Sequence, residues 1–267
     1  MVVEVEKGNF MPEFLRPTRL FDNLQDKINY AISLLRENEP PEGYYLAFSG
    51  GKDSCVIKQL AIEAGVKFDA WYNCTTIDPP ELIYFMREHH QDVKWNRQKV
   101  GMMKLLETKS DGPPTRWSRW CCQIYKEQGG VKRDTILGVR AAESAKRKLQ
   151  WKEIQPNFNN NLETAIICPI IYWKDEDVWD FIRSRNIPYC KLYDLGWKRL
   201  GCIGCPMSGK GRKRDFEKWP GYERNWKRAI AKNWENFHDK LNKRGLPRYQ
   251  NRYKSAEDFW DWWMEKK

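Results

Sequence analysis

Apolar residues recur along the chain in two patterns, short continuous runs and longer stretches with helical spacing. The runs predict buried strands over residues 44–48, 67–73, 92–95, 135–139 and 165–171. The helical spacing predicts helices over residues 20–37, 55–65, 79–90, 101–109, 174–185 and 215–242. Strands that alternate with helices are typical of α/β proteins, so we expect a Rossmann-like parallel sheet flanked by helices.

Stretches without either pattern, and a change in composition, divide the chain into regions. Residues 1–18 show no periodicity and predict an extended arm, whereas the polar, Asn-rich residues 154–161 predict a loop. We expect an N-terminal arm and helix over residues 1–43, the α/β domain over 44–208, and a basic, Trp-rich helical extension over 209–267.

Positive charge is concentrated toward the C-terminus. The 267 residues carry a net charge of +11, and residues 197–254 hold 17 Lys and Arg against five Asp and Glu, which accounts for the whole excess. A basic surface favours anionic partners, such as an adenine nucleotide or a nucleic acid. The tryptophans of this region have two interpretations, the core of a helical cap or a platform on which bases stack.

The N-terminus lacks the basic start and apolar core of a secretory signal, and no apolar run is long enough to span a bilayer. We therefore expect a cytoplasmic protein with no membrane partner. In a reducing compartment its eight cysteines should be thiols or metal ligands rather than disulfides. Four of them lie within predicted elements or beside prolines and are interpreted as small core residues. These are Cys55, Cys74, Cys168 and Cys190.

The turn after the first predicted strand reads SGGKDS at residues 49–54. Adjacent glycines let the backbone approach a ligand, and the N–H groups at a helix start favour a phosphate. Lys52 adds a positive charge, and Asp53 suits the helix N-cap or a Mg²⁺ ion. We predict that the turn binds the phosphates of an adenine nucleotide; the alternative is an ordinary turn with Ser49 or Asp53 as N-cap. The predicted binding residues are Ser49, Gly50, Gly51, Lys52, Asp53 and Ser54.

A second segment follows the strand predicted over 135–139. Arg140 at the end of this strand suits bidentate contacts to phosphate or sulfate. The alternative is a solvated, charged loop. We predict that Gly138, Arg140, Glu143 and Arg147 contribute the second half of the nucleotide site.

The remaining four cysteines form two pairs, the adjacent Cys121 and Cys122 and the C-x-x-C of Cys202 and Cys205. Closely spaced ligands of one tetrahedral Zn²⁺ usually have two or more residues between them. Adjacent cysteines fit better on a cluster that has several separate irons. We therefore favour a [4Fe–4S] site, while Zn²⁺ or buried structural thiols remain alternatives.

These motifs together resemble a known family. They are SGGKDS at 49–54, TIDPPE at 76–81, RWCC at 119–122 with Lys126, GVRAAES at 138–144 with Arg147, DVW at 177–179, IPY at 187–189, LYDLG at 192–196 and GCIGCP at 201–206. The chain resembles the phosphoadenosine phosphosulfate (PAPS) reductase family, within the PP-loop ATP-pyrophosphatase or adenine nucleotide alpha-hydrolase-like superfamily. The resemblance covers about residues 44–208.

The resemblance implies a Rossmann-like (HUP-type) sheet with an adenine nucleotide over the 49–54 turn. It also implies a [4Fe–4S] cluster on the two cysteine pairs, and a 138–147 segment that faces the phosphate or sulfate end of the ligand. The assimilatory reductases of the family carry a catalytic cysteine in a C-terminal Glu-Cys-Gly-type motif, whereas no Cys follows Cys205 here. An intact SGGKDS is typical of members that split ATP into AMP and pyrophosphate.

Both departures favour an ATP-dependent enzyme that adenylates an acceptor for sulfur insertion, as in the sulfur modification of nucleic acids. Lys52, Asp53 and Arg140 are the predicted catalytic residues, with Mg²⁺ at the phosphates. The second hypothesis is reduction of adenylyl sulfate or PAPS to sulfite, and the third is a non-catalytic nucleotide- or nucleic-acid-binding protein. Further candidate partners are a sulfur donor, a thioredoxin-like reductant and a second copy of the chain.

Overall fold

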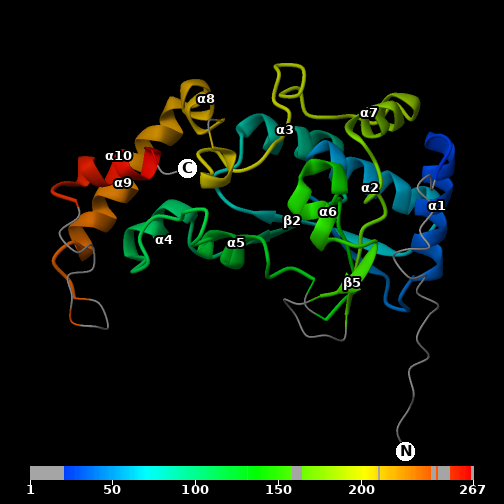
Figure 1. The fold of residues 1–267 in the computed structure, drawn as a ribbon, viewed down its shortest axis with the longest axis horizontal. Helices are drawn as coiled ribbons and strands as arrows, with labels where there is room; N and C mark the ends of the chain where they lie inside the picture. The colour runs from blue at the N-terminus through cyan, green and yellow to red at the C-terminus, as the bar shows by residue number, and fades with distance from the viewer. Residues whose placement is uncertain are drawn as a thin grey trace, which may run out of the picture.

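The computed structural model describes residues 21–130, 132–157, 164–209, 211–241, 245 and 253–265. Figure 1 shows the arrangement of the helices and strands. The arm expected over residues 1–18 lies outside the described residues.

The described part of the chain contains one six-stranded sheet in the order β3-β2-β1-β4-β6-β5. The strands are β1 Tyr44–Ala47, β2 Phe68–Cys74, β3 Lys94–Arg97, β4 Thr135–Ile136, β5 Ile154–Pro156 and β6 Ala165–Ile167. Neighbouring strands from β3 to β6 are parallel, and β5 pairs antiparallel with β6 at the edge. The expected parallel, Rossmann-like sheet is therefore confirmed.

The helices before the second cysteine pair lie near the positions that the apolar spacing predicts, except two short ones over residues 120–125 and 145–150, which the sequence did not predict. They are α1 Leu24–Glu37, α2 Lys52–Ala64, α3 Pro80–His89, α4 Met102–Thr108, α5 Trp120–Tyr125, α6 Ala145–Gln150 and α7 Asp175–Ser184, with the 3₁₀ turn η2 at Ala141–Glu143. The helices after the second cysteine pair are α8 Gly211–Lys218, α9 Pro220–Phe237 and α10 Ala256–Glu265, and the 3₁₀ turn η3 at Pro206–Ser208 precedes them.

Several element predictions were wrong in detail; the strand expected over 135–139, for example, ends at Ile136. The stretch expected as a loop over 154–161 begins with β5, whose three residues pair with β6. The strand expected over 165–171 ends at Ile167. The single helix expected over 215–242 is divided before Pro220, because proline has no N–H to donate and its ring restricts the residue before it.

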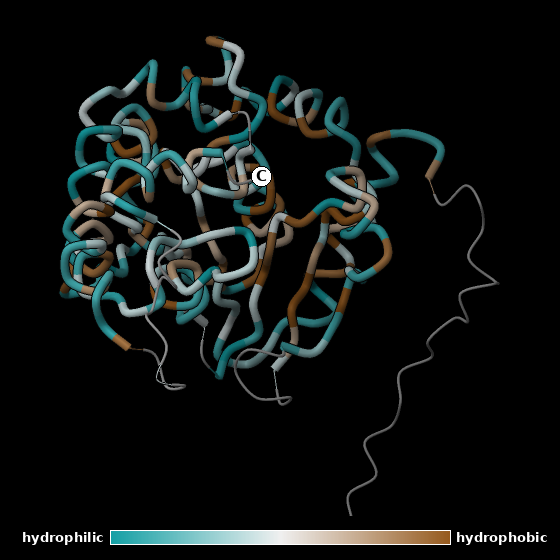
Figure 2. Tube along the Cα trace, turned by 60° about the vertical axis from the view of Figure 1, so that its left-hand side comes forward, coloured by the Kyte–Doolittle hydropathy of each residue, from teal (hydrophilic) through white to brown (hydrophobic). Residues whose placement is uncertain are grey.

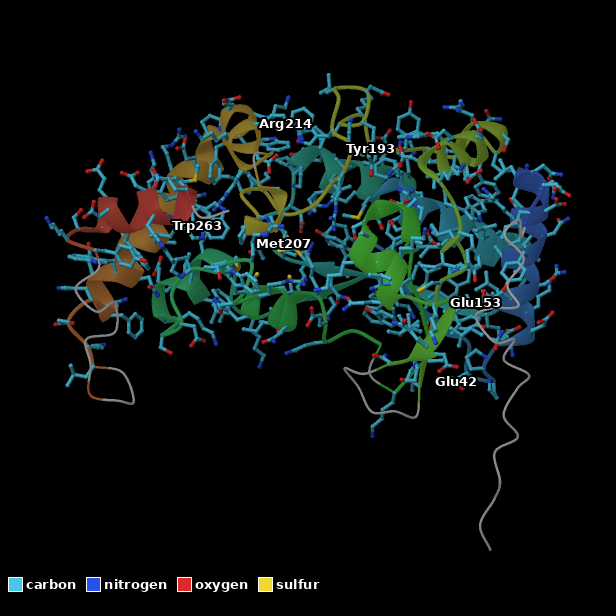
Figure 3. The ribbon with its side chains drawn as sticks, viewed as in Figure 1. Glu42, Glu153, Tyr193, Met207, Arg214 and Trp263 are labelled. Atoms are coloured by element: carbon cyan, nitrogen blue, oxygen red, sulfur yellow. The ribbon has the colours of Figure 1, made fainter. Side chains whose placement is uncertain are left out.

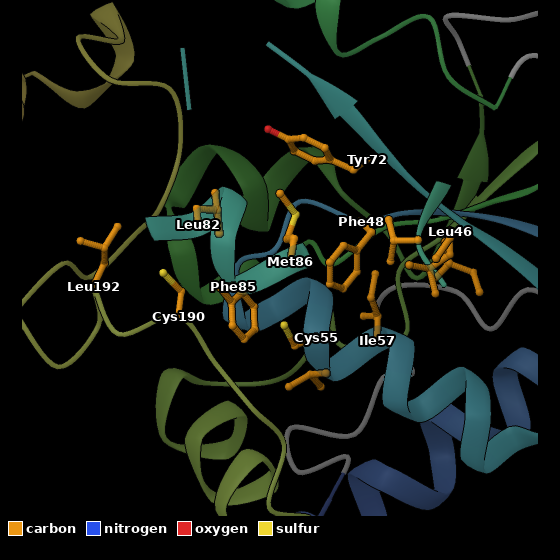
Figure 4. Packing of buried hydrophobic residues seen from close by; sticks show 14 of the residues in the cluster. Leu46, Phe48, Cys55, Ile57, Tyr72, Leu82, Phe85, Met86, Cys190 and Leu192 are labelled. Atoms are coloured by element: carbon orange, nitrogen blue, oxygen red, sulfur yellow. The ribbon is translucent and has the colours of Figure 1, made fainter. Parts of the chain in front are cut away.

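The core lies between the central strand and the helices that follow β1 and β2. Figure 4 shows Leu46 of β1 packed near Ile57 of α2, with Leu82 and Met86 of α3 beside them. All four side chains are almost completely buried. Each such aliphatic side chain contributes roughly 1.5–3 kcal/mol when it leaves water. This packing fixes α2 and α3 beneath the end of β1, where the phosphate turn begins.

Helices α8, α9 and α10 gather with α4 at one end of the molecule, opposite α1 (Figure 1). Trp226 of α9 stacks on Trp263 of α10 with ring centroids 4.7 Å apart, and both side chains are buried. The indole of Trp263 also donates to the carbonyl of Pro114 at 2.8 Å. These tryptophans therefore form the core of a helical cap, as the first interpretation has it.

Apolar segments lie mainly along the strands, within a largely hydrophilic outline (Figure 2). Among the described helices, none is long and apolar enough to cross a membrane.

Candidate active site

The predicted phosphate turn follows β1 directly, and its backbone requires glycine at one position. Gly50 has a φ of +72°, and a Cβ there would lie 2.8 Å from both Leu82 Cδ1 and Met86 Sδ. A larger residue would therefore be strained and would collide with the core of α3. Because α2 begins at Lys52, the turn ends at the N-terminus of a helix.

The start of α2 has no side-chain cap. Its N-cap residue is Gly51, so neither Ser49 nor Asp53 has the capping role of the alternative interpretation. The backbone N–H of Lys52 instead donates to the hydroxyl of Tyr193 at 2.9 Å. The N–H groups at a helix start, together with the helix dipole, favour an anion at this position.

Four charged side chains form an ion network beside the turn. Arg140 Nε donates to Asp53 Oδ1 at 2.6 Å, and Arg140 Nη2 donates to Asp175 Oδ1 at 2.9 Å. Lys52 Nζ lies 3.0 Å from the same Asp175 oxygen and 3.5 Å from Asp53 Oδ2. The Lys52 and Arg140 side chains are only 5% and 4% exposed. The three predicted catalytic residues, Lys52, Asp53 and Arg140, are thus brought together.

The 138–147 segment lies against the turn, as expected. A Cβ on Gly138 would come within 3.2 Å of the Asp53 backbone, so this segment packs directly on the start of α2. Glu143 forms an ion pair with Arg147 and accepts a hydrogen bond from the Arg140 N–H at 3.3 Å. Burial, followed by the nearby positive charge of Arg199, lowers the pKa of Arg147. The guanidinium of Arg147 is therefore half-buried, with Glu143 as an ion-pair partner and the charge of Arg199 nearby.

The two cysteine pairs also approach one another. A hydrogen bond with Cys122, together with burial and the charges of Cys122, Cys202 and Cys205, raises the pKa of the Cys121 thiol. The same hydrogen bond lowers the pKa of Cys122, against the effect of burial and with the help of Arg119. Within the described residues, no group of three or more His, Cys, Asp or Glu side chains has the geometry of a metal site. The four thiols are near neighbours without forming a closed ligand shell.

The loop of the second cysteine pair is attached to the segment after β2. The N–H of Ile203 donates to the carbonyl of Ile77 at 2.8 Å. Cys202 Sγ lies 3.5 Å from Thr75 Oγ1, and that hydroxyl donates to the buried Asp78 at 2.6 Å. The TIDPPE motif at 76–81 therefore positions the C-x-x-C loop.

A positively charged side chain, that of Lys126, lies near the C-x-x-C loop. The charge of Cys202 raises the pKa of Lys126, and Asp78 and Cys205 add to the effect. Lys126 thus faces the second cysteine pair.

Of the other cysteines, Cys55, Cys168 and Cys190 are buried, as the interpretation of core residues requires, and Cys74 is half-buried. Beneath the turn, Cys55 Sγ lies 3.7 Å from His90 Nε2, and Lys58 Nζ lies 3.2 Å from His90 Nδ1. The sequence assigns no role to His90, because none of the histidines has ligand spacing.

Sequence reasoning missed Asp175 and Tyr193 at the site. Asp175 belongs to an acidic run before the DVW motif, and such runs are usually solvated. Tyr193 belongs to the LYDLG motif, which was quoted only for the resemblance. Figure 3 labels Tyr193 on the segment between α7 and α8 and Met207 just after the second cysteine pair. The order of the motifs along the chain was the only signal that this segment returns to the turn.

The sequence matches the family model described as the phosphoadenosine phosphosulfate reductase domain over residues 43–208. An uncharacterized protein of Methanocaldococcus jannaschii is 28% identical over 264 residues, covering 83% of this chain and 54% of that protein. The adenosine 5'-phosphosulfate reductase of Staphylococcus epidermidis is 38% identical over 116 residues, covering 41% of this chain and 47% of the reductase. The chain spans about half the length of these relatives.

Among solved structures, the phosphoadenylyl-sulfate reductase of Candida auris in its phosphate complex has a TM-score of 0.51 at 17% identity. The match covers 67% of this chain and 93% of the reductase. At this identity the likeness shows a shared fold.

Proposed function

Because this chain belongs to the phosphoadenosine phosphosulfate reductase domain family, we propose that it binds ATP at the 49–54 turn and cleaves it between the α- and β-phosphates. The product would be an adenylated acceptor, activated for replacement of an oxygen by sulfur. We further propose that the acceptor is a nucleic acid.

One observation carries the proposal. Two buried cations, Lys52 and Arg140, meet beside the backbone N–H groups at the start of α2, whose N-cap residue provides no capping side chain. Cations and helix N–H groups that converge on one point suit the oxygens of a polyphosphate.

The chemistry follows from charge development in an in-line displacement. An oxygen of the acceptor attacks the α-phosphorus, the bond to the bridging oxygen breaks, and pyrophosphate leaves with added negative charge. Lys52, Arg140 and the N–H groups of the turn stabilise that charge where it appears. A sulfur nucleophile from a separate donor then displaces AMP, so that sulfur replaces the activated oxygen.

Asp53 would hold a Mg²⁺ ion at the phosphates, because carboxylates are preferred ligands of this cation. In the present structure the Asp53 carboxylate is paired with Arg140. A polyphosphate that draws Arg140 away would leave this carboxylate for the metal.

Cys121, Cys122, Cys202 and Cys205 would hold a [4Fe–4S] cluster, since four thiolates are the ligand set such a cluster needs. The interaction of Cys121 with the other three thiols supports this assignment. The cluster would supply a site for sulfur or electron transfer. Lys126 and Arg119 would balance the negative charge of the thiolates.

The Lys and Arg side chains of α8 and α9 would bind the backbone of the nucleic acid. Exposed residues such as Arg214, Lys227 and Arg228 are suited to phosphate contacts. Trp226 and Trp263 are buried and do not serve as stacking platforms. Binding should therefore depend strongly on salt and weakly on base identity.

The test is incubation of anaerobically prepared protein with ATP, Mg²⁺, sulfide as the sulfur donor and either DNA or transfer RNA, followed by measurement of AMP and pyrophosphate. We expect both products in equal amounts, and dependence on the nucleic acid. If ATP binds but neither product forms with any acceptor, the non-catalytic alternative replaces the proposal.

A second candidate is reduction of adenylyl sulfate or PAPS. It is favoured by the similarity to adenosine 5'-phosphosulfate reductases. Release of sulfite from either sulfonucleotide, in the presence of a thiol reductant and without ATP, would decide for it.

A further inference from the structure

Asp175 has an unusual position for an exposed carboxylate. A single atom of its carboxylate, Oδ1, contacts both buried cations. It lies 3.0 Å from Lys52 Nζ and 2.9 Å from Arg140 Nη2. The Asp175 side chain is 56% exposed, whereas those of Lys52 and Arg140 are almost inaccessible. One carboxylate at the surface thus pairs with two positive charges that lie beneath it.

A single anionic oxygen held by a lysine and an arginine is also the arrangement that a phosphate oxygen would take. The nearby N–H of Lys52, a donor suited to phosphate, is occupied in a similar way by the hydroxyl of Tyr193. Asp175 and Tyr193 both belong to the part of the chain that follows β6. Two donors of the phosphate turn are therefore satisfied by protein oxygens from one region.

We propose that Asp175 takes the place of a phosphate oxygen in the nucleotide-free protein and must be displaced when the nucleotide binds. This inference rests on the proposed function, and it adds a selectivity: the ligand must bring enough negative charge to replace a carboxylate. ATP and pyrophosphate bring more negative charge and more phosphate oxygens to the two cations than AMP, which has one phosphate, and therefore displace the carboxylate more readily.

The exposure of Asp175 is what makes the exchange feasible. Lys52 and Arg140 are held in the interior and cannot follow their partner into water without exposing a buried cation. Asp175, in the first turn of α7, can rotate into solvent and keep its charge near a helix N-terminus, where a carboxylate is favoured. Asp53, 22% exposed, stays with Arg140 or turns to the metal.

The experiment compares Asp175→Asn with Glu176→Gln, because both variants remove one negative charge from the first turn of α7. Glu176 is exposed and lies next to Asp175 in sequence, so it controls for the change in overall field. Calorimetry at constant ionic strength would measure the binding of ATP, pyrophosphate and AMP to both variants and to the unaltered protein. Thermal unfolding would confirm that the variants are folded, and Asp175→Ser would serve as a second uncharged replacement.

We expect Asp175→Asn to bind ATP and pyrophosphate about tenfold more tightly, because the carboxylate no longer competes with the phosphate for Lys52 and Arg140. AMP should gain clearly less, and Glu176→Gln should change all three by less than about twofold, as a solvent-exposed charge does. A merely structural role of Asp175 would instead shift all three ligands in parallel.

Three results would overturn the inference. They are unchanged or weaker polyphosphate binding by Asp175→Asn, an equal gain in the Glu176→Gln control, and a loss confined to ATP with Mg²⁺, which would make Asp175 a metal ligand. If the unaltered protein binds ATP and only these comparisons fail, the proposed function stands. If neither the protein nor its variants bind any of the ligands, both proposals fall.

Discussion

The phosphate turn and the cysteine site balance charge in opposite ways. At the turn, two buried cations, Lys52 and Arg140, are neutralised by carboxylates of the protein. At the cysteine site, thiols face Arg119 and Lys126, and the pKa of each of these cations is raised, chiefly by its interaction with Cys122 and Cys202 respectively. Both sites follow parallel strands at the carboxyl edge of the sheet, the edge where such folds bind ligands.

The difference indicates which kind of ligand each site accepts. Exchanging the Asp175 carboxylate for a phosphate replaces one anion with another beside Lys52 and Arg140, so the turn suits an anion. Four neighbouring thiols cannot all ionise unless a cation joins them, so the cysteine site suits a metal. Under the proposed function, an anion site and a cation site therefore lie at one edge of the sheet.

The strongest test of the contrast is removal of a thiol. Cys202→Ser should abolish bound iron, because a cluster with three thiolates is incompletely held. Iron analysis and absorbance near roughly 400 nm would measure the loss. Cys74→Ser, which changes a half-buried cysteine outside the two pairs, should keep the iron. Equal iron in both variants, or zinc without iron in the unaltered protein, would rule out a [4Fe–4S] cluster at the cysteine site.

At the turn, the largest effect should come from removing a cation. Lys52→Ala and Arg140→Ala should each lower the rate of pyrophosphate release by about 100- to 1000-fold, the usual effect of losing one stabilising donor at a leaving group. Lys146→Ala, an exposed change on α6, is the matched control. Iron content should be unaffected in all three, and a loss of iron in Arg140→Ala would contradict the separation of the sites.

The stability of the folded protein should depend on pH through His90, which is buried beneath the turn. Burial, followed by the charge of Lys58, lowers the pKa of His90 to about 4. The unfolded chain therefore binds a proton near its ordinary pKa of about 6.5 while the folded protein does not, so stability falls as pH drops from about 6.5 to 4, by up to about 3 kcal/mol. His90→Gln should flatten that slope in denaturant titrations at several pH values. An unchanged slope would show that His90 does not titrate in this way.

The smallest effect should come from the link between the segment after β2 and the C-x-x-C loop. Thr75→Val removes a hydroxyl that donates to Asp78 and lies beside Cys202, and should cost about 1–2 kcal/mol of unfolding free energy. Denaturant unfolding would measure it against Thr108→Val, at an exposed residue whose hydroxyl donates to the carbonyl of Leu105 in its own helix. If Thr75→Val matches this control, the link contributes little to stability.

The elements with strong apolar patterns were predicted well from sequence. Residues 44–48 are apolar throughout, since β1 has sheet neighbours on both sides and helices over it, and the structure places β1 there. β5 was missed because an edge strand of three residues carries too short a pattern to be distinguished from a loop.

The site was predicted less completely, and the reason is spatial. Lys52 and Arg140 were predicted because each lies next to a recognisable local pattern, a glycine turn and the end of a strand. Nothing in the sequence around Asp175 indicates its role. The fold brings Arg140 to Asp53, 87 residues away in sequence, and to Asp175, 35 residues away. Single-sequence patterns describe neighbours along the chain, and this network joins residues that are distant in it.

The bond from Trp263 to Pro114 has a consequence for how the protein is made. It joins residues 149 positions apart, and it holds the segment that leads to Cys121. On the ribosome, that cysteine pair emerges long before α10 exists to brace it, and domains form progressively as the chain grows. A cluster at this site, as proposed, would therefore be fully supported only after α10 has been made.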